Sequence, residues 1–173
     1  MQFLKAGESR AWAARRGFSI DASFGHPIAS DLAAPVWFNI PSDAGARVAL
    51  ARMLWETVGQ TAPEVLVWVT EWGVWPSGEC PPLVTAARRG LGAQQDLAES
   101  PGHLVRLGET HAGLAIFTLA ILSLWDCWVL STNQAALFVS HDEYGAADSR
   151  TDDEELRRRL RLLGHLRAEA PAI

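Results

Sequence analysis

The sequence contains very little lysine. Of its fifteen lysine and arginine residues only Lys5 is a lysine, and the twenty aspartates and glutamates give a net charge of −5. A protein that binds duplex nucleic acid usually has a basic stripe, because neutralising phosphates supplies most of its affinity. The only dense basic run, residues 157–161, follows acidic residues, which is typical of a solvated helix face. We therefore expect no nucleic-acid partner.

Cysteine is also scarce, and several motifs are missing. Cys80 and Cys127 are the two cysteines, and they form no CxxC pair, which argues against a zinc ribbon or a thioredoxin-type redox site. The phosphate-binding patterns GxxxxGK[ST] and GxGxxG do not occur. We expect neither a cofactor nor a bound metal.

The first ten residues lack the apolar segment of a secretory signal, so a cytoplasmic location with free thiols is expected.

No apolar run is long enough to span a membrane. One uncharged segment, Ala112–Trp125, has fourteen residues and ends at Asp126, whereas a spanning helix needs about 20. This segment predicts a helix buried in a protein core, and no membrane association. The rival interpretation, attachment to a membrane through this segment, stays open at this point.

The sequence predicts one domain, residues 1–173, with a well-filled core, because 49% of the residues are hydrophobic. Hydrophobic periodicity and turn residues predict strands at 1–4, 36–40, 64–70, 103–107, 127–130 and 136–140. Helices are expected at 8–16, 42–58, 82–90, 109–124 and from 151 to about 167, the last begun by a Thr151–Glu154 capping box. This order favours an α/β (or α+β) fold with a mixed sheet of about five strands covered by helices, ending in a hairpin and a C-terminal helix.

The strongest strand, 64–70, leads into a segment rich in polar and aromatic side chains. Ligands of open α/β sheets bind beyond the carboxyl ends of the strands. In one interpretation Trp72 and Trp75 stack on a ligand and Glu71 acts as acid, base or anchor. In the other the indoles close the core and Glu71 pairs with an arginine. Ser77 and Glu79 complete the predicted ligand-binding set from this loop.

A second polar stretch, Ser140–Tyr144, ends the predicted hairpin. Adjacent Ser, His and Asp residues cannot form a catalytic triad, because side chains alternate between the faces of a strand. His141 and Glu143 could share one face and ligate a metal, with a third ligand from elsewhere. The candidates for that third ligand are His103, His111, Glu71 and Asp126. The simpler interpretation is a polar turn with a hydrogen-bonded histidine.

Three stretches together resemble a family of uncharacterised bacterial proteins. They are EWGVWPS (71–77), SPGHL (100–104) and SHDE (140–143). The resemblance covers roughly residues 60–145. It implies a bacterial protein and transfers no catalytic residues, because the family has no settled activity.

Two functional hypotheses follow from these patterns. The first is a binding or interaction protein, with a small molecule or a protein as its partner. It would use Trp72 and Trp75 as anchors, and Glu143 would also contact the ligand. The second is a small hydrolase or transferase with an acid–base site made of Glu71, His103, His141 and Asp142, which requires that these side chains converge in one cleft.

Overall fold

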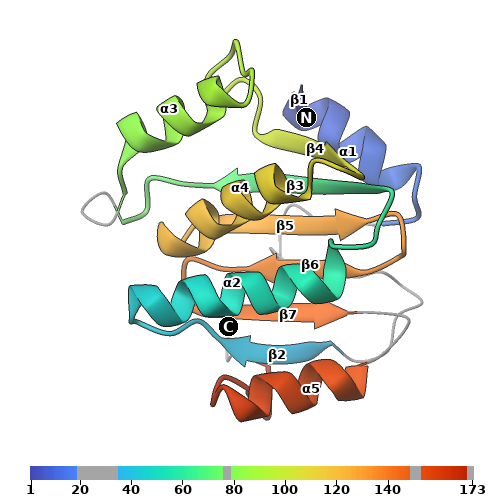
Figure 1. Cartoon of the computed structure of the whole chain (residues 1–173), viewed down its shortest axis with the longest axis vertical. Coiled ribbons are helices and arrows are strands. Elements are labelled where there is room, and N and C mark those ends of the chain that lie inside the picture. Colours follow the sequence, from blue (N-terminus) through green and yellow to red (C-terminus); the bar gives the residue numbers. More distant parts are fainter. Residues whose placement is uncertain (19–34, 76–78, 149–152, 171–173) are drawn as a thin grey trace.

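A seven-stranded sheet organises the computed structural model, which describes residues 1–18, 35–75, 79–148 and 153–170. Along the sheet the strand order is β1-β4-β3-β5-β6-β7-β2 (Figure 1). The strands are β1 (Gln2–Leu4), β2 (Val36–Asn39), β3 (Glu64–Glu71), β4 (Gly102–Arg106), β5 (Asp126–Ser131), β6 (Ala136–Val139) and β7 (Tyr144–Asp148). β3 therefore lies inside the sheet, between β4 and β5.

Helices cover both faces of this sheet. They are α1 (Ala6–Ala14), α2 (Ala44–Val58), α3 (Pro81–Gly90), α4 (Thr110–Leu122) and α5 (Asp153–Leu162). α2 and α4 lie side by side across the face that is nearest the viewer in Figure 1, and α5 lies beyond β2 at one end of the strand stack. α3 lies near the other end, and its Val84 joins the same apolar cluster as α2 and α4. Trp12 and Ala13 of α1 belong to the apolar cluster of the opposite face.

The sequence of β3 explains its interior position. Val65, Val67 and Val69 join the apolar cluster beneath α2 and α4, while Leu66 and Trp68 join the cluster on the α1 side. All five side chains are buried. A strand with apolar residues on both faces is stable only where helices or other layers cover both of them. The prediction of a covered, interior strand at 64–70 thus agrees with the structure.

The expected sheet of about five strands is roughly consistent with the structure, but its mixed character needs correction. Helices and a sheet do combine as predicted, but the sheet has seven strands and each of its six pairings is antiparallel. Crossover helices do join strands that run in the same direction, such as β4 and β5. β3 is inserted between those two strands and runs the opposite way. The β-α-β order of the sequence was therefore correct, while the inference of adjacent parallel strands was wrong.

The strand missing from the sequence prediction is β7. Its sequence, YGAAD, lacks the branched and aromatic residues that mark strands. The small residues have a steric cause, because a Cβ atom added to Gly145 would lie 2.2 Å from the Phe38 ring and 2.6 Å from the carbonyl oxygen of Phe138. The predicted hairpin of β5 and β6 is confirmed, and β7 extends it to a third strand.

The uncharged segment at 112–125 forms most of α4 and the turn after it. Ile116, Phe117, Ala120 and Ile121 are buried, and α4 packs on α2, β3, β4 and β5. Among the described residues no helix has the length and apolar character needed to cross a membrane. The proposed capping box begins at Thr151, outside the described residues.

Candidate functional site

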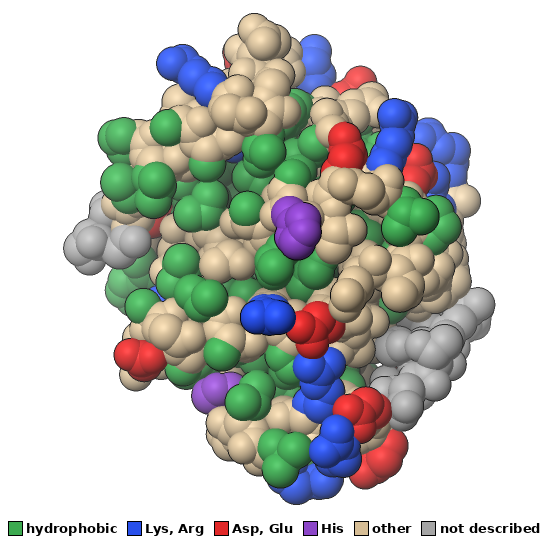
Figure 2. Space-filling model, viewed as in Figure 1, with side chains coloured by type: hydrophobic (Ala, Val, Ile, Leu, Met, Phe, Trp, Pro, Cys, Tyr) green, Lys and Arg blue, Asp and Glu red, His purple; other side chains and the backbone are tan. Residues whose placement is uncertain are grey.

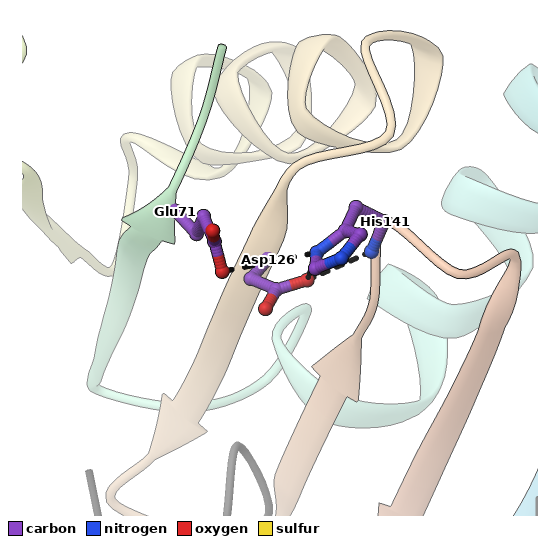
Figure 3. Close-up of side chains that lie close together, drawn as sticks. All are labelled: Glu71, Asp126 and His141. Atoms are coloured by element: carbon purple, nitrogen blue, oxygen red, sulfur yellow. Dashed lines mark hydrogen bonds and ion pairs between the residues drawn. The ribbon is translucent and has the colours of Figure 1, made fainter. Parts of the chain in front are cut away.

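One end of the sheet brings together three polar side chains from distant parts of the sequence. Glu71 is the last residue of β3, Asp126 is the first residue of β5, and His141 lies in the turn between β6 and β7 (Figure 3). Glu71 and Asp126 are partners across the β3–β5 pairing, where a register shift follows Val69. One ligand atom from each of the three side chains lies within 4.8 Å of the others.

Asp126 holds His141 in place through two contacts to a single oxygen. Its Oδ1 accepts a hydrogen bond from the backbone N–H of His141 at 2.7 Å and lies 2.9 Å from the His141 ring atom Nδ1. The side chains are 13% and 22% exposed, so solvent reaches this pair only in part. A carboxylate that accepts from Nδ1–H fixes the ring orientation and leaves Nε2 free to accept a proton.

Glu71 adds a second carboxylate on the same side of the ring as Asp126, near Nδ1. Its Oε2 lies 3.9 Å from Nδ1 of His141, and its side chain is exposed. On the far side, Asp142 Oδ1 lies 3.6 Å from Nε2. His141 is therefore surrounded by three carboxylates and is the only basic group in a recorded ion pair with Glu71, Asp126 or Asp142 among the described residues.

The two predicted tryptophan anchors border this cluster. Trp72 and Trp75 are 37% and 50% exposed, so neither indole closes the core. Trp75 is also held in a fixed position, because its Nε1–H donates to the carbonyl oxygen of His141 at 3.2 Å. Glu79 accepts from the backbone N–H of Gly73 at 2.7 Å and thereby joins the residue after Trp72 to the segment that precedes α3. Ser77 lies outside the described residues.

Glu143 does not act as a partner of His141. Its Oε1 lies 3.3 Å from an Arg47 guanidinium nitrogen, so the suggested His141–Glu143 metal pair is not assembled. Arg47 also donates to the carbonyl oxygens of Pro41 and Leu122. It thus joins the start of α2, the end of α4 and the β6–β7 turn. The alternation expected of a strand fails here because residues 140–143 form a tight turn, with Glu143 at a φ of 63°.

His103 lies elsewhere, and the expected convergence of four residues in one cleft is wrong in this respect. β3 and β5 separate its strand, β4, from β6. The ring is fully buried, with Nδ1 lying 3.2 Å from the carbonyl oxygen of Val67. Burial, and secondarily the charge of Arg88, lower the pKa of His103 to about 3. A neutral, enclosed imidazole cannot exchange protons with a substrate at the sheet end.

Sequence reasoning underestimated the roles of two residues at this site, Asp126 and Arg47. Asp126 entered only as one of several possible third ligands, although it has the shortest contacts to His141. Arg47 was not among the candidate site residues at all. The signal for Asp126 was its place directly after the buried helix, at the start of a hairpin strand. Sequence spacing gave no comparable signal for Arg47, since its contacts are to residues of three other segments.

The cysteines add no nucleophile to this cluster. Cys127 follows Asp126 directly, but its thiol is buried, and burial raises its pKa well above the usual range. A buried thiol that stays protonated is unreactive. Cys80 is exposed at the start of α3.

Comparison with known proteins gives no further assignment for this arrangement. A scan against protein-family models, a search of curated proteins and a search of solved structures each returned no match to the chain. The resemblance to an uncharacterised bacterial family remains a prediction from three short stretches.

Proposed function

We propose that the protein is a binding domain that recognises a positively charged protein surface with the end of its sheet. One observation carries this proposal: the Trp75 indole is half exposed and yet is fixed by a hydrogen bond to the His141 carbonyl oxygen. Tryptophan is enriched among the residues that dominate binding energy. An aromatic side chain that is already held in place loses little conformational entropy on binding.

The charges around the indoles indicate the chemistry of the partner. Glu71, Asp142 and Glu143 are exposed, while Arg47, which pairs with Glu143, is mostly buried. The face shown in Figure 2 differs, because charges of both signs lie together over α5 and the adjoining part of α2. There Arg52 and Arg159 pair with Glu56. The acidic and aromatic sheet end favours arginine or lysine side chains, which bind carboxylates and also stack on indole rings.

Removing both indoles is expected to abolish partner binding without unfolding the protein. The double variant Trp72→Ala/Trp75→Ala removes two exposed anchors, each with an expected contribution of about 2 kcal/mol, so the dissociation constant rises by roughly 1000-fold. Proteins captured by the wild type and lost by the double variant would be purified, and their affinities measured by calorimetry in low and high salt. Salt should slow association with a basic partner.

Leu107→Ala provides the matched control for that experiment. Leu107 is one of the most exposed apolar residues and lies beside the start of β3, at the opposite end of the sheet. This variant should bind every partner as the wild type does. Equal binding by the Trp72→Ala/Trp75→Ala protein would contradict the proposed docking surface.

The contact between Asp126 and His141 supports a second candidate function, a hydrolase or transferase. Here Nε2 of His141 would accept the proton of a nucleophile, and Asp126 would orient the ring. Purified protein should then cleave some member of a panel of chromogenic esters and phosphate esters, and His141→Ala should lower that rate by at least ~100-fold. Glu143→Gln should retain it. A rate that is unchanged in His141→Ala would exclude this candidate.

A further inference from the structure

The side chains of Glu71, Asp126 and His141 together have the composition and spacing of a metal site. We propose that they bind one divalent transition metal ion, through one carboxylate oxygen from each acid and Nδ1 of the histidine. These atoms lie within 4.8 Å of one another. Ligands about 2.1 Å from a tetrahedral ion are roughly 3.4 Å apart, so small side-chain rotations suffice. The inference does not depend on the proposed partner.

Rigid elements supply all three ligands. The backbones of β3 and β5 pair at Glu71 and Asp126, so their Cα positions are fixed by the sheet. The backbone N–H of His141 bonds to Asp126, which fixes the turn that carries the imidazole. Sites on strands and tight turns hold their geometry better than sites on long loops. The ligands therefore approach one point before any ion arrives.

The charges at this point also favour a cation. Glu71 and Asp126 lie directly opposite each other on neighbouring strands, and like charges in such positions are destabilising. Glu56, Glu64, Glu143 and Glu155, by contrast, each pair with an arginine. Among the described residues, no arginine or lysine is recorded in an ion pair with Glu71 or Asp126. A divalent ion would neutralise both carboxylates.

The far side of the imidazole supplies an independent indication. Metal-binding histidines commonly direct the other ring nitrogen at a carboxylate, which fixes the tautomer that ligates. Nε2 of His141 lies 3.6 Å from Asp142 Oδ1. When the ion binds Nδ1, the ring proton resides on Nε2 and faces Asp142. The same histidine thus has a ligand position on one side and, on the other, an exposed carboxylate that a small side-chain rotation would bring within hydrogen-bond distance of its N–H.

The donor set indicates the class of ion. Imidazole nitrogen suits zinc and other transition metals, whereas an all-oxygen site would suit magnesium or calcium. One nitrogen and two oxygens point to Zn²⁺, Co²⁺ or Mn²⁺. Three protein ligands leave at least one position open for water or for an oxygen or nitrogen of a bound molecule, as in catalytic rather than structural zinc sites.

Calorimetry with Zn²⁺, and visible spectroscopy with Co²⁺ as the probe, would test this inference on the full chain after treatment with EDTA. We expect saturable binding of one ion per chain. His141→Ala and Asp126→Asn should weaken it by at least ~10-fold, as should Glu71→Gln, and Asp142→Asn should weaken it less. Glu143→Gln and His111→Ala, which alter a neighbouring acid and an exposed histidine, should leave the affinity unchanged.

Circular dichroism in EDTA would show that each variant is folded. If Asp126→Asn is not folded, Glu71→Gln decides the question, because Glu71 is exposed at the end of its strand. The absence of saturable binding, or equal affinity in the wild type and the folded ligand variants, would overturn the metal site. Partner capture in EDTA separates the two proposals, since docking on Trp72 and Trp75 needs no ion.

Discussion

Trp55→Ala is expected to lower the free energy of unfolding by about 3–5 kcal/mol, the usual cost of removing a large aromatic side chain from a core. Trp55 lies on α2, is 2% exposed, and contacts the Phe117 ring of α4. Its indole occupies space that two glycines leave open. A Cβ atom on Gly113 would lie 2.4 Å from the indole, and one on Gly59 would lie 2.9 Å from it. Urea denaturation monitored by circular dichroism would measure the loss.

A double-mutant cycle makes this prediction specific. Gly113→Ala alone should destabilise the protein by about 1–3 kcal/mol, because the new methyl group meets the indole. In the Trp55→Ala background the same substitution should be stabilising, since the methyl group enters a cavity and alanine favours the helix by about 1 kcal/mol over glycine. Gly7→Ala in α1, where nothing lies within 4 Å, is the control. Additive effects would contradict the proposed packing.

Acidification from pH 8 to pH 5 is expected to cost about 2 kcal/mol of stability through His103 alone. Burial holds the pKa of this histidine near 3 in the folded chain, whereas in the unfolded chain it is near 6.5. Below pH 6.5 the unfolded state therefore binds a proton that the folded state does not. The stabilisation is complete above pH 6.5 and is lost progressively as the pH falls towards 3.

His103→Asn is the variant that tests this account. The asparagine amide can replace Nδ1–H as donor to Val67, and it does not titrate. The dependence on pH between 8 and 5 should then be mostly abolished. A smaller part should remain, because burial also lowers the pKa of His165. Stopping at pH 5 keeps most carboxylates ionised, so acid-linked ion pairs contribute little. An unchanged slope in His103→Asn would show that other groups cause the pH dependence.

The sequence predicted where individual segments of the site lie better than it predicted which side chains meet there. The position of Trp72 and Trp75 at the end of an interior strand followed from the consecutive apolar residues of 64–70, which need cover on both faces. That the indoles are exposed did not follow, because a loop sequence does not say what packs on it. Burial of His103 could not be read from a short stretch, since α3, α4 and β3 enclose it from elsewhere in the chain.

The sequence by itself determined most of the segments that form strands and helices, because side-chain periodicity and turn residues act over a few positions. It therefore placed β3, the β5–β6 hairpin and the helix at α4. Only the tertiary structure decided that all the strands pair antiparallel, that YGAAD is a strand, and that Asp126 lies between Glu71 and His141. These outcomes depend on pairing and packing between residues far apart in the chain, which no local pattern encodes.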